Sequence, residues 1–217
     1  MFKINRIIKV LIGSDVFLLT GMGFVSPIFA LFINENIVSD PSEAAKVAGF
    51  SVAIYWGIKS LLEIPIGNYL DKNHGERDDV IFVILGNIIA TFSVFGYIFS
   101  SSASHIYLIQ LLYGVGMAMN IPAWTAIFTR HIDKGKEAFE WAARSTIVGL
   151  GAGAAGALGG VMVSIFGFDL LFVLVGFFVL LSSLVLFLIL WEMSPRDKKV
   201  PRVPETKGLQ EPQLPKD

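Results

Sequence analysis

The stretch Gly67-Asn68-Tyr69-Leu70-Asp71-Lys72-Asn73-His74-Gly75-Glu76-Arg77 decides the fold of this chain better than any other segment. A glycine and an aspartate four residues apart, Gly67 and Asp71, stand at the end of a long apolar stretch, and a short turn with Lys72, Gly75 and Arg77 follows. Gly67 allows a neighbouring helix to approach closely. The Asp71 carboxylate can accept hydrogen bonds from the N-terminus of another helix, whose dipole favours an anion. Gly75 allows a tight turn.

The composition places this loop in a membrane protein. Hydrophobic residues make up 54% of the 217 residues and charged residues only 16%, whereas a soluble domain has about 25% charged residues. A helix needs about 20 apolar residues to cross the ~30 Å hydrocarbon core. Six stretches are long enough: 8–33, 47–70, 80–100, 105–128, 145–167 and 170–191. They are continuous rather than alternating, which favours helices over strands.

The predicted fold class is therefore an all-α membrane protein. We expect a six-helix transmembrane domain at 1–191 and a disordered cytoplasmic tail at 192–217, which is rich in proline and charge. The third and sixth stretches contain few polar groups, so we expect these two helices to face lipid and the other four to face one another or a cavity. One lipid-facing helix in each group of three fits a 3+3 bundle.

The distribution of basic residues predicts the orientation of the chain in the membrane. All basic residues except Lys46 and Lys59 lie on one side of the six stretches, so the positive-inside rule puts both termini in the cytoplasm. We expect the cytoplasmic membrane of a prokaryote.

Charge and composition also exclude several functions. The net charge of −1 gives no reason to expect a nucleic-acid partner. The chain has no cysteine, and neither a metal-ligand spacing nor a cofactor motif. No catalytic constellation falls inside the stretches, so we do not expect an enzyme.

The opening loop resembles the signature loop of the major facilitator superfamily, roughly Gly-x-Leu-Ala-Asp-Arg-x-Gly-Arg-Arg. There are departures from this pattern: Tyr69 replaces Leu, Lys72 replaces Arg, and Gly75 comes one residue late. Just before the loop, Glu63-Ile64-Pro65-Ile66-Gly67 matches a Glu-x-Pro-x-Gly segment of several members. The segment 110–116 resembles the Arg-x-x-x-Gly-x-Gly motif of the fourth helix, with Gln110 in place of Arg. That departure argues against Arg-dependent proton coupling.

The fifth stretch is rich in glycine and resembles the family's antiporter motif. Its helix-packing glycines are Gly149, Gly153, Gly156 and Gly160. Gly156 stands where the family motif has proline, so a small-residue packing surface is the preferred interpretation.

The resemblance implies a fold and a function. It covers about residues 8–191 and matches the N-terminal six-helix half of a transporter that normally has twelve helices, with its transport site between the halves. It implies secondary-active transport of a small molecule or ion by alternating access, with membrane lipid around the chain. A single half then needs a partner: a second copy in a homodimer, or a separate six-helix half, against which Asp71 would cap a helix. The alternative is a non-transporting membrane scaffold, an assembly protein or a truncated remnant.

The polar groups inside the stretches are the candidate substrate or proton sites: Asp15, Lys59, Glu63, Gln110, Tyr113, Asn120 and Trp124. Asp15, Glu63 and Asn120 lie roughly 10–12 Å deep at 1.5 Å per residue, which predicts one polar layer. Lys59 and Glu63 are four residues apart, so they either bind substrate or form an ion pair that locks packing. One face of the fourth stretch carries four of these residues at helical spacing: Gln110, Tyr113, Asn120 and Trp124. This stripe predicts either a cavity wall or aromatic packing.

Overall fold

The computed structural model describes residues 4–73 and 75–192. Within these ranges the chain is helical and contains no strand, which confirms the predicted all-α class. The helices are α1 (Arg6–Val25), α2 (Phe29–Asn36), α3 (Pro41–Asn73), α4 (Glu76–Gly96), α5 (Ala103–His131) and α6 (Glu137–Glu192), with short 3₁₀ helices η1 (Ser26–Ile28) after α1 and η2 (Tyr97–Phe99) after α4. The predicted tail lies outside the described residues apart from Glu192.

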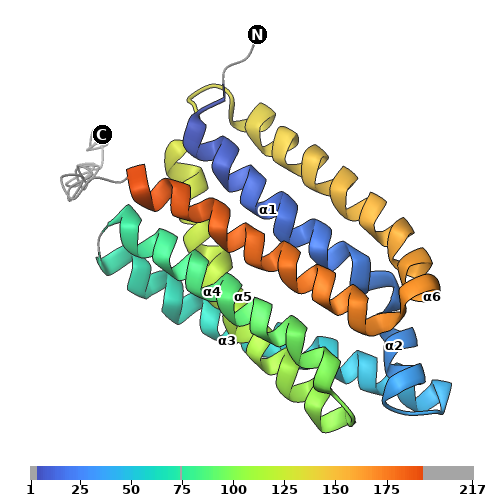
Figure 1. Cartoon of the computed structure of the whole chain (residues 1–217). Coiled ribbons are helices and arrows are strands. Elements are labelled where there is room, and N and C mark those ends of the chain that lie inside the picture. The colour runs from blue at the N-terminus through green and yellow to red at the C-terminus, as the bar shows by residue number, and fades with distance from the viewer. Residues whose placement is uncertain (1–3, 74, 193–217) are drawn as a thin grey trace, which may run out of the picture.

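Five helical segments of the described chain are long and apolar enough to cross a membrane, and not six separate ones. The difference lies in α6, which runs through both of the last two predicted stretches. It is broken at Gly167, where φ is 79° and ψ is 174°, a left-handed conformation that glycine adopts without strain. Figure 1 shows that α6 folds back there into a first arm (137–166) and a second arm (168–192), with α1 between them.

Helix α1 packs closely against both arms of α6. On the first arm, a Cβ added at Gly159 would overlap the carbonyl oxygen of Phe24. On the second arm, a Cβ at Gly21 of α1 would lie 2.9 Å from the Cβ of Phe178. In lipid no hydrophobic force drives helices together, so such backbone contacts between small residues supply much of the association.

Helix α5 joins α4 to α3 in the same way. Gly86 and Gly116 face each other across α4 and α5, and a Cβ at Gly116 would lie 2.7 Å from the Gly86 carbonyl oxygen. On its other side, Gly114 lies against the backbone of Tyr55 in α3, where a Cβ would come to 3.0 Å from the carbonyl oxygen. Helix α3 is the least buried of the long helices because α5 supplies most of its contacts.

A chain of buried hydrogen bonds crosses four helical segments. The amide of Asn120 in α5 donates to Oδ1 of Asn87 in α4 at 2.6 Å, and Nδ2 of Asn87 donates to Oγ of Ser182 in the second arm of α6 at 2.9 Å. The hydroxyls of Ser182 and Ser14 in α1 lie 2.8 Å apart. All four side chains are at most 3% exposed, so the network fixes how these helices are rotated toward one another.

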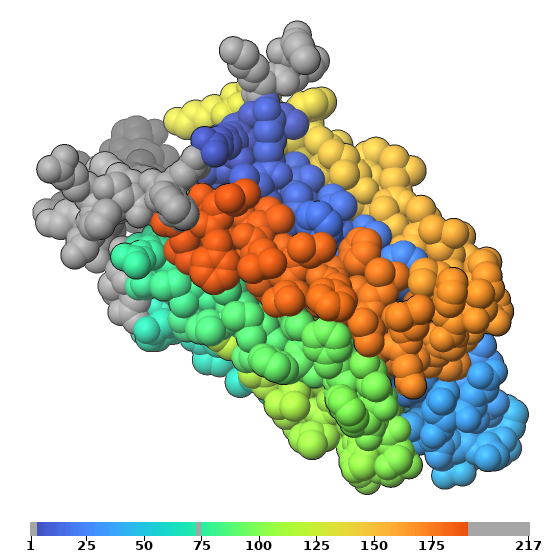
Figure 2. Space-filling view, in the orientation of Figure 1, coloured from blue at the N-terminus to red at the C-terminus, as the bar shows by residue number. Residues whose placement is uncertain are grey.

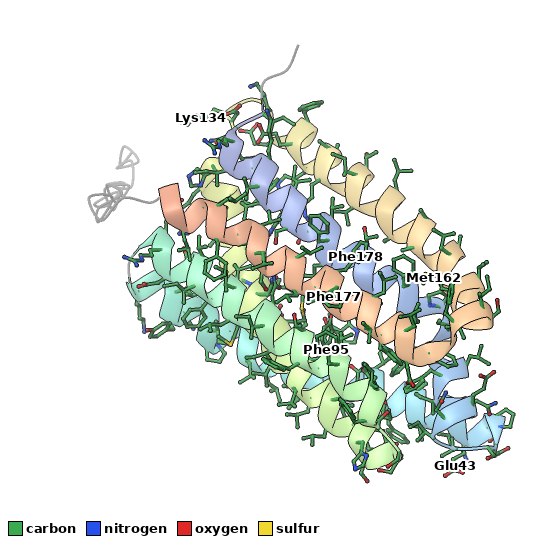
Figure 3. All side chains as sticks on the ribbon, viewed as in Figure 1. Glu43, Phe95, Lys134, Met162, Phe177 and Phe178 are labelled. Atoms are coloured by element: carbon green, nitrogen blue, oxygen red, sulfur yellow. The ribbon has the colours of Figure 1, made fainter. Side chains whose placement is uncertain are left out.

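Helix α4 and the second arm of α6 each have one core face and one exposed apolar face. Figure 3 shows Phe95 and Phe177 pointing toward one another between them, with ring centroids 6.3 Å apart, and Figure 2 shows the two helices in contact along the surface. On their outer sides Phe92 is 72% and Phe187 49% exposed. Both helices therefore present apolar side chains outward, yet they also carry Asn87 and Ser182 of the buried network.

Substitution of two neighbouring glycines tests the contact between α1 and the first arm. Gly159→Ala must displace the Phe24 backbone, and we expect it to lower the free energy of unfolding by about 1–3 kcal/mol. At Gly160 an added Cβ meets nothing within 4 Å, so Gly160→Ala should be neutral or stabilise the helix by up to ~1 kcal/mol. Unfolding of the single chain in mixed micelles measures both; equal values for the two variants would contradict this packing.

A double-mutant cycle tests the polar network. Asn87→Ala and Asn120→Ala should each destabilise the chain by roughly 1 kcal/mol, and the double variant by clearly less than their sum, because both break one shared hydrogen bond. Ser93→Ala is the control: its hydroxyl donates within α4, to the Ile89 carbonyl, so its effect should add to that of Asn120→Ala. Additivity for the Asn87–Asn120 pair would show that the bond contributes nothing.

Candidate functional site

Asp15 forms an ion pair with Arg144. The carboxylate lies in α1 and is only 5% exposed as a residue. Arg144 comes from the first arm of α6, and its Nε and Nη2 lie 2.7 Å and 2.6 Å from the same oxygen, Oδ2 of Asp15. The Arg144 side chain is 25% exposed, so one partner of this pair is buried while the other reaches an open face of the helix bundle.

Aromatic rings surround the Arg144 guanidinium. It lies 4.5 Å from the ring centre of Trp124 and 5.7 Å from that of Trp141, in the range of cation–π attraction. Trp124 also stacks on Phe128, with ring centroids 4.8 Å apart. Trp124 therefore packs against Arg144 and Phe128 and does not line the cavity that contains Gln110.

Arg144 is the residue that the sequence analysis missed. By sequence it belongs with the basic residues on the cytoplasmic side, just before the stretch 145–167, whereas α6 begins at Glu137 and Arg144 lies well inside the helix. A signal did exist: an aspartate inside an apolar span requires a partner. Arg144 follows Trp141 by three residues, which places both on one helix face.

Lys59 and Glu63 also form a pair. Lys59 Nζ lies 2.8 Å from a Glu63 oxygen, with the side chains 8% and 27% exposed. The same Nζ lies 4.6 Å from the ring centre of Trp56. The ion pair that the spacing allowed is therefore present on α3, covered on one side by an indole ring.

The three groups expected to form one polar layer lie in three separate interactions. Asp15 pairs with Arg144, Glu63 pairs with Lys59, and Asn120 belongs to the buried network. Within the described residues no ion pair or hydrogen bond joins these groups. These groups therefore do not form one cluster, because equal depth does not give equal rotation about the helix axes, and their common depth stays a prediction.

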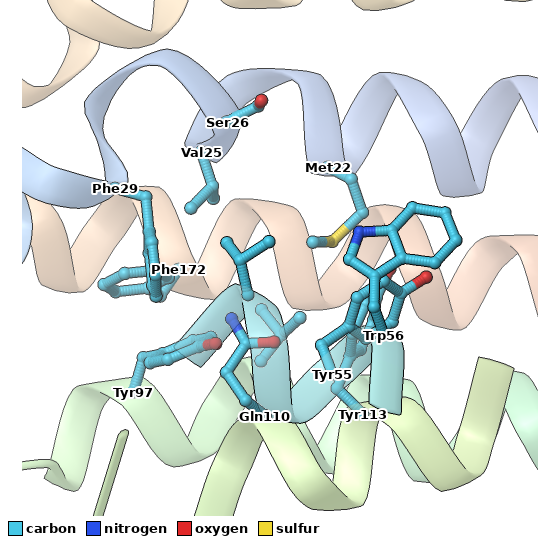
Figure 4. Close-up of a pocket in the computed structure, with 12 residues that line it drawn as sticks. Met22, Val25, Ser26, Phe29, Tyr55, Trp56, Tyr97, Gln110, Tyr113 and Phe172 are labelled. Atoms are coloured by element: carbon cyan, nitrogen blue, oxygen red, sulfur yellow. The ribbon is translucent and has the colours of Figure 1, made fainter. Parts of the chain in front are cut away.

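Gln110 and Tyr113 line a cavity of about 310 Å³ on the half of the molecule that contains the end of α1 (Figure 4). Its walls come from α1, η1, α2, α3, α4, η2, α5 and the second arm of α6. The lining residues are Met22, Val25, Ser26, Phe29, Val52, Tyr55, Trp56, Val94, Tyr97, Gln110, Tyr113 and Phe172. The predicted stripe on α5 therefore divides: its first two members line this cavity, and Asn120 and Trp124 lie in other clusters.

The opening loop is exposed at the end of α3. Asp71, Lys72 and Arg77 are all exposed, and Asp71 makes no ion pair or hydrogen bond with any residue that the structure describes. Gly67 is only loosely packed, since an added Cβ would be 4.0 Å from Pro122. Gly75 has φ −166° and ψ 138°, an extended conformation open to any residue. The backbone conformation at Gly75 therefore does not require glycine.

Two acidic residues at the end of the loop and just after it, Glu76 and Asp79, form ion pairs with α5. Asp79 and Glu76 at the start of α4 face Arg130 at the end of α5, and Arg130 Nη2 donates to Asp79. His131 Nδ1 lies 2.9 Å from Glu76. These contacts tie the ends of α4 and α5 together beside the loop.

The glycines selected on the fifth stretch differ in their surroundings. Gly156 packs on α1, with an added Cβ 3.6 Å from the Gly23 carbonyl oxygen, whereas Gly149, Gly153 and Gly160 face open space. The tightest contacts with α1 come from two others on this arm, Gly151 and Gly159. In the described part of the chain, no group of three or more His, Asp or Glu residues could hold a metal ion.

Comparison with known proteins identifies the family. No curated protein matched the chain. The family model of the Major Facilitator Superfamily matches residues 12–214 of the 217. The long apolar helices agree with this match, as do the glycine-mediated packing and the loop after α3. The chain therefore belongs to the Major Facilitator Superfamily of membrane transport proteins.

Proposed function

We propose that this chain carries a small solute across the membrane by alternating access, as one of two paired six-helix units. The observation that supports this most is the Asp15–Arg144 ion pair. An intramembrane charge costs several kcal/mol if it faces lipid, so such a pair is expected to serve either packing or transport. Here the arginine remains a quarter exposed, so a solute that competes for the pair can reach it.

The mechanism follows from the position of the pair. It bridges α1 and the first arm of α6, and a solute or proton that competes for either member would weaken this bridge. Loss of the bridge would let the two helices shift relative to each other, which is the local step that alternating access requires. Each arm of α6 crosses the membrane once in this proposal, which gives six crossings in a 3+3 arrangement.

A second unit would cover the face formed by α3 and the first arm of α6. Leu61 and Leu150 on these two segments are 73% and 71% exposed, and Gly149 and Gly153 leave room for a helix to approach. Asp71 would accept hydrogen bonds from a helix N-terminus of that unit. The partner is either a second copy, inserted in the same orientation with cytoplasmic termini in a prokaryotic cytoplasmic membrane, or a different six-helix half.

Flux measurements test the transport proposal. Purified chain in liposomes is screened for solute uptake with and without a pH gradient. We expect Arg144→Gln and Asp15→Asn each to lower the flux at least tenfold, because each leaves one charge without its partner. The reversed pair, Asp15→Arg with Arg144→Asp, should fold but not restore flux.

The control variant is Ser164→Ala, whose hydroxyl bonds within its own helix and whose flux should equal that of the wild type. Full flux in Arg144→Gln would remove the ion pair from the mechanism. If the wild type moved no solute, and the charge variants changed only stability, the scaffold interpretation would replace transport.

Enlarged side chains test the pairing of two units. Gly153→Trp adds a large group where the single chain has open space, so the fold should persist while the two-chain mass in native mass spectrometry is lost. Leu85→Trp enlarges an exposed position of α4 and should leave the pair intact. A wild-type chain that is strictly monomeric and still transports would rule out the paired unit.

A further inference from the structure

The cavity between α1, α3 and α5 is shaped as a small-molecule site. It measures about 310 Å³, at the lower end of the range for ligand pockets. Its mouth lies between α1 and α3, where Ser26 and Trp56 are exposed, and its floor is formed by the buried side chains of Val25 and Phe172. The cavity is therefore open to a ligand from one side and closed on the other.

Aromatic rings form two opposite walls. On one side the rings of Tyr55 and Tyr113 lie 5.3 Å apart and 30° from parallel. On the other, Tyr97 stacks on Phe172 at 5.1 Å and 27°. Ring pairs in such tilted or stacked geometry extend readily to a further flat ring, which favours an aromatic ligand over an aliphatic one of equal size.

The cavity also contains polar groups that a ligand can bond. Among the described residues, neither the Gln110 amide nor the hydroxyls of Tyr55, Tyr97 and Tyr113 make a side-chain hydrogen bond. Figure 4 shows the Gln110 amide pointing into the space between the surrounding side chains. Gln110 is half-buried, and its amide can both donate and accept a hydrogen bond, so a ligand that offers a donor or acceptor can bond it.

The cavity carries no charge. No lining residue is ionic, and the nearest charges, Lys59 and Glu63, neutralise each other at 2.8 Å beyond Trp56. A charged ligand would lose its hydration here without gaining a counter-charge. The charged pair at Asp15 belongs to a separate cluster around Trp124.

We propose that this cavity binds a neutral aromatic molecule with one hydrogen-bonding group, held between the tyrosine walls and by the Gln110 amide. The proposal names the class of solute for the transport proposed above and rests on that function for its biological role. The binding itself does not require transport, so the two can be tested apart.

Equilibrium dialysis of radiolabelled indole against the purified full chain in mild detergent provides the test, with protein-free micelles as the blank. We expect saturable binding of indole. Indole-3-acetate and tryptamine, which add a negative or a positive charge to the same ring system, should bind at least tenfold more weakly. Gln110→Leu should weaken indole binding roughly fivefold, the ratio expected for one lost neutral hydrogen bond.

A second variant keeps the test independent of any packing change at Gln110. Ser26→Trp places a large ring at the exposed mouth and should reduce indole binding more than tenfold. Leu112→Trp enlarges an exposed position on α5 that does not line the cavity, and its binding should equal that of the wild type. Size-exclusion profiles show that each variant is folded.

Indole retention equal to that of empty micelles would overturn the proposal, and so would unchanged binding in Ser26→Trp or equal binding of the charged analogues. Saturable binding that responds to Ser26→Trp, in a chain that moves no solute in liposomes, would support the site and refute transport. Flux of another solute without indole binding would refute the site and leave transport standing.

Discussion

A hydrogen-bond chain from Ser14 through Ser182 and Asn87 to Asn120 is the constraint on which the arrangement of helices depends. In hydrocarbon these side chains have no water to bond, so each must find a partner on another helix. Their short side chains satisfy one another only if α1, α4, α5 and the second arm of α6 come close together at one rotation. The glycine contacts at Gly86 and Gly21 then allow the backbones to reach that distance.

The same constraint divides the molecule into a closed and an open part. The network and the stacked rings around Phe172 bury the contact between α4 and the second arm of α6. Helix α3 and the first arm of α6 lie outside the network, and each is held mainly by one neighbour. Charged groups are found on these open segments, as Lys59, Glu63 and Arg144.

Two chemically different sites share α1. At its middle, Asp15 pairs with Arg144, whose guanidinium packs against Trp124 and Trp141. Near its end, Met22 and Ser26 border an uncharged aromatic cavity. A single helix connects them, so a displacement of α1 from the first arm of α6 would move residues of both sites. In the function proposed above, a charge-dependent step and the binding of an uncharged solute would act through one rigid element.

The sequence by itself determined the all-helical membrane class and the family, because hydropathy, length and a local motif depend only on neighbours along the chain. It also allowed the Lys59–Glu63 pair, whose partners are one helical turn apart. Only the tertiary structure decided that Asn120 meets Asn87, that Arg144 reaches Asp15 and that Gly151 and Gly159 pack on α1. Helical periodicity shows which residues share a face, but the packing of all the helices together sets which neighbour that face meets.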